Sequence, residues 1–175
     1  MGLAIPTKLE APLVRALDGL VAEGLYQSRS EAIRDAVRRL VERNYISKIR
    51  FLRVIAEVSA QLILDEYGDA VTDIILYGSV ASGSVSDDSD IDILVLVSDT
   101  MGKNLSQVEI RIHEITYAVA LSSGSVITPI VLSRRKFMDL AGEGEHFARE
   151  IAKYGIEIKG TTLNELRKHG LSEKG

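Results

Sequence analysis

Hydrophobic and polar positions in the first fifty residues predict a short strand followed by two helices. Residues 3–9 alternate apolar and other side chains with a period of two, which is typical of a strand with one buried face. Residues 11–25 and 28–45 instead carry apolar side chains at helical spacing. Ser28 and Glu31 stand at the start of the second helix with the spacing of a capping box.

This strand–helix–helix unit is not expected to be stable as a monomer. A lone strand leaves its backbone hydrogen bonds unsatisfied, and two short helices cannot bury a sufficient core. We therefore expect the unit to pair with a second copy of itself. The protein would then be a homodimer joined through the strand at residues 3–9.

The rest of the chain alternates helical and strand-like patterns, which predicts an α/β (α+β) fold with a mixed sheet. The predicted order is a helix at 44–68, strands at 72–78 and 90–97, a helix at 104–120, a strand at 125–133, and a helix with a short closing strand at 145–160. The expected organisation is an N-terminal unit at 1–44, a connecting helix at 45–68, a second domain at 69–160 and a polar tail at 161–175.

The composition is typical of a soluble globular protein, with 46% hydrophobic and 26% charged residues in a chain of 175. Residues 1–53 carry ten Lys and Arg against six Asp and Glu, whereas residues 54–175 carry eleven against nineteen. The chain has no cysteine and three scattered histidines, so any metal would be held by oxygen ligands. No apolar run approaches the length of a membrane span, and no signal peptide is evident, so we expect a cytoplasmic protein with no membrane partner.

Residues 75–97 combine Gly-Ser pairs and aspartates between two apolar runs. Gly78 and Ser79 follow a predicted strand, and a helical turn that begins there presents free N–H groups to an anion. Asp90 and Asp92 lie two residues apart, so their carboxylates share a face of the next strand and repel each other unless a cation lies between them. Mg²⁺ suits carboxylate oxygens and completes its shell with nucleotide phosphates. The pattern therefore predicts a phosphate-binding turn followed by a magnesium site.

Residues 13–42 resemble the ribbon-helix-helix family of dimeric regulators. The resemblance implies that the paired strands enter the major groove of duplex DNA, and that backbone amides near Ser28 and Arg29 hold a phosphate. The strand positions that would then face the bases are Ala4, Pro6 and Lys8. Of these, only Lys8 offers a donor to a base or a phosphate. Two interpretations stay open: the unit binds DNA, or it only joins two chains.

The spacing Gly-Ser, ten residues, Asp-Ile-Asp is similar to the signature of the DNA polymerase beta-like nucleotidyltransferases, and the resemblance to their minimal branch extends over roughly residues 69–160. It implies transfer of a nucleoside monophosphate from a nucleoside triphosphate to an acceptor. It also implies that the catalytic and Mg²⁺-binding residues are Asp90 and Asp92, and that the nucleotide-binding residues are Gly78, Ser79, Ser82 and Gly83. The minimal branch also implies a partner protein, as in toxin–antitoxin pairs.

The sequence departs from this family where a third carboxylate is common. The corresponding run, residues 125–133, contains no acid, and Thr128 is the polar member of its three candidate positions. The base that accepts the proton of the nucleophile is therefore not evident. Glu109 and Glu114 belong to a neighbouring amphipathic helix, where such residues are mostly solvated.

A second departure concerns positive charge at the turn. Val80 and Ser82 stand where related sequences often carry arginine, which predicts weaker triphosphate binding. Arg134, Arg135 and Lys136 are the nearest replacement in the sequence pattern, although a charged run after a strand usually lies on the surface.

The main hypothesis is a Mg²⁺-dependent nucleotidyltransferase that its N-terminal unit dimerises and directs to DNA. The alternative is a DNA-binding regulator or antitoxin-like protein whose second domain senses nucleotide or has lost catalysis. The missing third carboxylate favours the alternative, and transfer of labelled nucleotide to an acceptor distinguishes the two.

Overall fold

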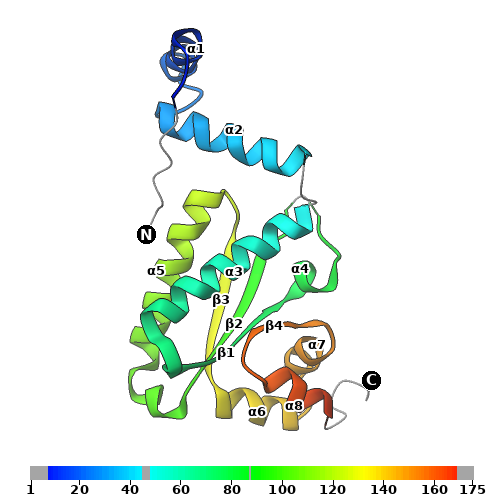
Figure 1. Ribbon diagram of the computed structural model, residues 1–175. Helices are drawn as coiled ribbons and strands as arrows, with labels where there is room; N and C mark the ends of the chain where they lie inside the picture. The colour runs from blue at the N-terminus through cyan, green and yellow to red at the C-terminus, as the bar shows by residue number, and fades with distance from the viewer. Residues whose placement is uncertain (1–7, 45–47, 87, 169–175) are drawn as a thin grey trace. The chain divides into compact units, whose positions relative to one another are not determined.

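The computed structural model describes residues 8–44, 48–86 and 88–168 (Figure 1). The chain divides into two compact units, Met1–Tyr45 and Ile46–Gly175. Each unit has its own packing, and the two are described in turn.

The first unit contains helices α1 (Ala11–Ala22) and α2 (Arg29–Asn44). The expected capping pair is present at the start of α2, because Ser28 Oγ accepts the N–H of Glu31 at 3.2 Å. The Glu31 carboxylate in turn accepts the N–H of Gln27 at 2.6 Å. These bonds satisfy N–H groups that have no partner within the helix, so α2 begins where the sequence predicts.

A polar contact ties the turn between the two helices to α2. The Tyr26 hydroxyl donates to Asp35 Oδ2 at 2.7 Å, and Asp35 also pairs with Arg38 and Arg39. The Tyr26 hydrogen bond, with smaller effects of the two guanidinium groups, lowers the pKa of Asp35 despite the opposing effect of burial. The Asp35 carboxylate is therefore buried in its charged form with its partners in place.

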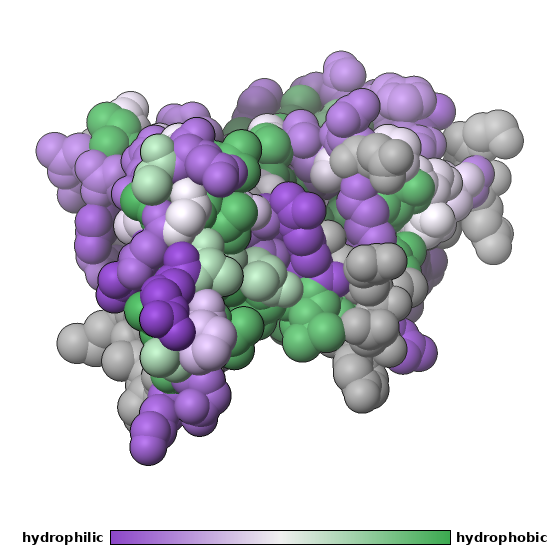
Figure 2. All heavy atoms as spheres, turned by 90° about the horizontal axis from the view of Figure 1, so that it is seen from above, coloured by the Kyte–Doolittle hydropathy of each residue, from purple (hydrophilic) through white to green (hydrophobic). Residues whose placement is uncertain are grey.

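The first unit exposes much of its apolar surface. Leu13, Leu25, Val37 and Leu40 are each more than half exposed, whereas the buried hydrophobic residue in the described part of this unit is Ala32. Hydrophobic residues are visible among the hydrophilic ones on the face that Figure 2 shows. The strand predicted at 3–9, with Ala4 and Pro6, lies outside the described residues except for Lys8 and Leu9, which have no regular secondary structure.

The second unit has four strands and six α-helices among its described residues. The strands are β1 (Val71–Tyr77), β2 (Ile91–Val97), β3 (Ile127–Ser133) and β4 (Ile156–Lys159). The α-helices are α3 (Lys48–Tyr67), α4 (Gly78–Ser82), α5 (Leu105–Ser123), α6 (Arg134–Gly142), α7 (His146–Tyr154) and α8 (Thr162–Lys168). Short 3₁₀ segments, Gly68–Ala70 and Asp99–Asn104, follow α3 and β2.

The four strands form one mixed sheet in the order β3-β2-β1-β4. β1 pairs antiparallel with β2 and with β4, whereas β2 and β3 run parallel and are joined through α5. The mixed sheet that the sequence predicts is therefore confirmed. The central strands β1 and β2 are buried along nearly their whole length, because helices cover both faces of the sheet.

Alternate residues of the central strands pack into two separate cores. Ile74 and Ile93 belong to the core that α3 and α5 cover. Ile75 and Leu94 belong to the core on the other face, which α6, α7 and α8 cover (Figure 1). This alternation decides on which face each polar side chain at the strand ends lies.

Helix α3 is part of the second unit, although the sequence predicts a connecting helix at 45–68 and a domain that begins at residue 69. Its residues Leu52, Ala56, Ala60 and Ile63 are buried in the core beneath the sheet. An apolar stripe predicts that one face of a helix is covered but does not identify the covering surface.

The polar tail predicted at 161–175 is wrong for its described part. Residues 162–168 form α8, and Leu163 and Leu166 are fully buried against α6 and α7. The start of α8 is held by Asp73, a buried residue of β1 that accepts the N–H groups of Thr161 and Thr162 at 2.9 and 3.0 Å. Two leucines among polar residues were too short a signal to predict this packing.

None of the described helices is both long and apolar enough to cross a membrane.

Candidate functional site

The turn from β1 into α4 brings Gly78 and Asp92 together. Tyr77, the last residue of β1, pairs with Asp92 across the sheet. Gly78 has a φ of 69°, and a Cβ added to it would lie 2.2 Å from Asp92 Oδ2. Only glycine therefore allows the carboxylate to lie against the turn without displacement. The sequence separates these two residues widely, and the antiparallel pairing of β1 with β2 joins them.

Helix α4 is a single compact turn. Ser79 O accepts the N–H groups of Gly83 and Ser84 at 3.0 Å each, and Ser82 Oγ donates to the same oxygen at 3.3 Å. Gly83 ends the turn with a φ of 87°. The first N–H groups of such a turn have no acceptor within it, which is the property that an anion site requires. The four residues predicted to bind nucleotide thus belong to one local structure.

Asp90 and Asp92 flank the start of β2. Both are partly buried. Asp92 is the second residue of β2 and Asp90 directly precedes the strand, and in extended backbone a separation of two residues corresponds to about 6 to 7 Å. Burial and, to a smaller extent, the nearby Asp90 raise the pKa of Asp92. Burial and the Asp92 charge likewise raise the pKa of Tyr77 to about 12. Negative charge is therefore concentrated at this end of the sheet, and Asp90 is the charged side chain that affects the pKa of Asp92.

Of the three candidate positions for a third carboxylate in residues 125–133, the pairing of β2 with β3 selects Thr128. In the parallel pairing of β2 with β3, Asp92 lies opposite Thr128, so the two side chains share a face. Thr128 is exposed. Among the described residues no group of three His, Cys, Asp or Glu side chains could hold a metal ion. The donor set at this end of the sheet is therefore two carboxylates and a neutral hydroxyl.

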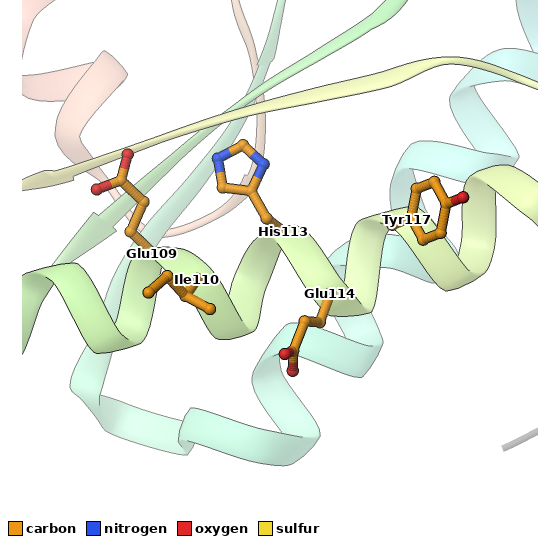
Figure 3. A pocket seen from close by; sticks show the side chains of 5 residues that line it. All are labelled: Glu109, Ile110, His113, Glu114 and Tyr117. Carbon is orange, nitrogen blue, oxygen red and sulfur yellow. The ribbon is translucent and has the colours of Figure 1, made fainter.

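The two glutamates of α5 do not supply the missing acid. Glu109 and Glu114 lie on the exposed face of α5, where they line a shallow surface hollow with Ile110, His113 and Tyr117 (Figure 3). Helix α5 covers the face of the sheet on which Ile93 lies, and Asp92 lies on the opposite face. Glu114 also accepts a hydrogen bond from Arg111 at 2.9 Å.

The basic run after β3 begins at the end of the sheet opposite to Asp92, because Ser133 pairs with Val97 whereas Thr128 pairs with Asp92. Arg134 donates to Thr162 Oγ1 at 3.1 Å and to Glu165 at 2.5 Å, and its Nε lies 3.7 Å from Asp73 Oδ2. Arg134 therefore anchors α8. Arg135 and Lys136 are exposed in the first turn of α6. Val80, where related sequences often carry arginine, is fully buried, so a charged side chain would not fit there.

One functional candidate was not predicted from the sequence. Arg53 of α3 donates hydrogen bonds to the carbonyl oxygens of Val80 and Ala81, with distances of 3.2 to 3.3 Å. No local pattern links an arginine in a helix to a turn 27 residues later. Only the packing of α3 against the sheet makes the contact.

The DNA-binding candidates of the first unit are partly engaged in its own structure. Lys8 is exposed and precedes α1. Ser28 caps α2, as described above. Arg29 forms two hydrogen bonds with Asp18, one of them 2.7 Å between Nη2 and Oδ2, and the pair lowers the pKa of Asp18. A phosphate contact by the Arg29 side chain would have to compete with Asp18.

Comparison with known proteins identifies both units. Residues 60–162, more than half of the chain, match the family described as Polymerase beta, Nucleotidyltransferase. The chain therefore belongs to this nucleotidyltransferase family. Residues 8–44 match the Ribbon-helix-helix protein, copG family, which confirms the resemblance of the first unit to the ribbon-helix-helix family.

Two solved structures are similar to the chain. One is a crystal structure of a toxin–antitoxin with AMP-PNP, at 20% identity and a TM-score of 0.41. The other is a crystal structure of a mutant of the toxin–antitoxin MntA-HpeT, at 19% identity and a TM-score of 0.41. Each match covers 67% of this chain and 90% of the other. No curated protein matches the chain.

Proposed function

We propose that the protein is a Mg²⁺-dependent nucleotidyltransferase that transfers a nucleoside monophosphate from a nucleoside triphosphate to an acceptor. The observation that carries the proposal is the contact between Gly78 and Asp92, because it brings the phosphate-binding turn and the carboxylate pair to one point. The family supplies the class of reaction.

The donor atoms at the site fit a magnesium ion. Asp90 and Asp92 offer two carboxylates on one face, and no hydrogen bond or ion pair to another described residue occupies them. When bound, the metal would neutralise the charge of the phosphates and of the leaving pyrophosphate. Gly78, Ser79, Ser82 and Gly83 would orient the phosphates through backbone N–H groups and hydroxyls.

The N-terminal unit would dimerise the protein and bring it to duplex DNA. Its exposed apolar residues, such as Val37 and Leu40, support dimerisation, because a second copy would bury them. The support for DNA binding is the family match and the exposed Lys8. Residues 1–44 carry seven Lys and Arg against six Asp and Glu, so DNA affinity would depend on a few placed cations rather than on net charge.

A second candidate function is regulation without turnover. Thr128 opposite Asp92 is the observation that favours it, because a neutral hydroxyl is a poor acceptor for the proton of a nucleophile. The protein would then bind DNA and sense nucleotide, or act as the antitoxin-like member of a pair with a toxin protein.

One incubation tests the main proposal. The full-length protein is incubated with Mg²⁺ and α-³²P-labelled ATP or the other nucleoside triphosphates, with candidate protein and RNA acceptors in parallel. Transfer of label to an acceptor, lost in Asp90→Asn and Asp92→Asn, supports the enzyme. Mg²⁺-dependent nucleotide binding without transfer to any acceptor supports the sensor, and absence of binding contradicts both.

A further inference from the structure

Arg53 lies under the turn that forms the proposed nucleotide site. It projects from α3 and is half-buried. Its Nε and Nη2 atoms both lie 3.3 Å from Val80 O, and Nη2 lies 3.2 Å from Ala81 O. One planar guanidinium thus binds two successive carbonyl oxygens of α4.

These two carbonyl oxygens need a donor from outside the turn. Helix α4 has only five residues, so most of its carbonyl groups have no partner in a following helical turn. The N–H groups of Gly83 and Ser84 both go to Ser79 O. Val80 and Ala81 are buried, and a carbonyl group left without a donor in such surroundings is costly. The guanidinium of Arg53 meets this need with a charged donor.

We propose that Arg53 is a positioning residue for the nucleotide site: by binding Val80 O and Ala81 O it holds the turn Gly78–Ser82 in the conformation that receives the phosphates. The role in nucleotide binding rests on the proposed function. Without Arg53 the turn populates other conformations, and the apparent affinity for nucleotide falls by the fraction of molecules in the competent one. Arg53 itself touches neither nucleotide nor metal in this role.

The chain offers a matched control on the same helix. Arg50 lies three residues before Arg53 in α3 and is exposed. Arg50→Met removes the same charge as Arg53→Met, at a similar place in the sequence, without removing the hydrogen bonds to α4. A difference between the two variants therefore reports those bonds and not the net charge.

Two measurements on the full-length protein test the proposal. The first is hydrogen exchange of the backbone amides of residues 79–84 without nucleotide. The second is the dissociation constant of a non-hydrolysable ATP analogue with Mg²⁺. We expect Arg53→Met to speed exchange in this segment and to weaken binding by about tenfold, and Arg50→Met to match the wild type in both. If turnover is measurable, Arg53→Met should raise KM by more than it lowers kcat.

The outcomes distinguish failure of the Arg53 proposal from failure of the proposed function. Exchange and binding by Arg53→Met equal to those of Arg50→Met would overturn the proposal. If the wild type bound no Mg²⁺-nucleotide, the proposed function and the nucleotide role of Arg53 would both fail, and exchange would still decide whether Arg53 holds the turn. If Arg53→Met does not fold, Arg53→Lys is the variant to test. One ammonium group cannot make the planar guanidinium's paired hydrogen bonds to Val80 O and Ala81 O, so we expect nucleotide binding to be weakened severalfold. Nucleotide binding equal to that of the wild type would overturn the proposal.

Discussion

Replacing Asp92 by asparagine should stabilise the metal-free fold slightly and abolish metal-dependent nucleotide binding. The substitution keeps the size of the side chain and removes its charge. If the pair is a metal site, that charge is unfavourable in the empty protein and necessary in the loaded one. A structural carboxylate would behave in the opposite way.

The size of the stability change follows from the geometry of the pair. Two carboxylates two residues apart on a strand are about 6.6 Å apart. Their repulsion is about 2.5 kcal/mol at an effective dielectric constant of about 20, and because both groups are partly exposed, screening reduces it to about 1 kcal/mol. We therefore expect Asp92→Asn to raise the melting temperature of the metal-free second unit by about 4 °C at most.

The pH dependence of the stability change tests whether the charge of Asp92 causes it. Burial and Asp90 raise the pKa of Asp92 above the ordinary value of 3.8, so the folded protein holds this proton more tightly than the unfolded chain. The higher stability of Asp92→Asn relative to the wild type should be present above the raised pKa. It should vanish well below pH 3.8, where the aspartic acid of the wild type is as neutral as the asparagine of the variant.

The assay is denaturation of the full-length protein with a chelator, from pH 3 to pH 8, and titration with a non-hydrolysable ATP analogue with and without Mg²⁺. Asp88→Asn is the matched control, because Asp88 is an exposed residue of the loop that precedes β2. In an enzyme, Asp92→Asn should also lower transfer by about 10² to 10³. A lower melting temperature with unchanged nucleotide binding would refute the reasoning, since it would make Asp92 a structural residue.

Four further predictions concern both units. Light scattering at micromolar concentration should give a dimer, and Leu40→Glu should shift it toward monomer; a monomeric wild type would contradict the interface. DNA affinity measured by fluorescence anisotropy should fall steeply with salt, and Lys8→Ala should reduce the salt slope by about one unit; an unchanged slope would remove Lys8 from the interface. Thr128→Asp should strengthen Mg²⁺ binding without nucleotide by about tenfold or more in calorimetry; no change would place residue 128 outside the site. The Tyr26 hydrogen bond lowers the pKa of Asp35, so the stabilisation by the Asp35 carboxylate should be complete above the ordinary pKa of 3.8 and lost as pH falls through the lowered pKa. Asp35→Asn should therefore be less stable than wild type at pH 7 but not at the lowest pH. An equal difference in stability at both pH values would refute this.

Much of the fold could be predicted because its signals are local. The apolar runs of β1 and β2, the glycine after α3 and the capping pair Ser28 and Glu31 depend on residues close together in the sequence. The carboxylate pair was predicted for the same reason, since two residues on one strand share a face whatever the rest of the chain does.

The parts that could not be predicted depend on long-range packing. The partner of Arg53 is 27 residues away, and Asp73 meets the start of α8 after 88 residues. Helix α3 has the same apolar stripe whether it connects two units or covers a sheet. The register of β3 against β2 could not be predicted from the sequence either, and this register places Thr128 beside Asp92.

The sheet order has a consequence for folding during synthesis. β1 is synthesised early in the second unit, whereas β4, which pairs with one of its edges, is synthesised much later. The N–H groups of Thr161 and Thr162, which donate to the buried Asp73 of β1, are also synthesised after β1. Until those residues leave the ribosome, the nascent chain presents a hydrophobic strand with an open edge. At about 5 to 20 residues per second, the 84 residues from Gly78 to Thr161 take about 4 to 17 seconds to make. Cellular yield of this protein should therefore depend on chaperones that shield open strand edges, and should fall when translation is slowed between β1 and β4.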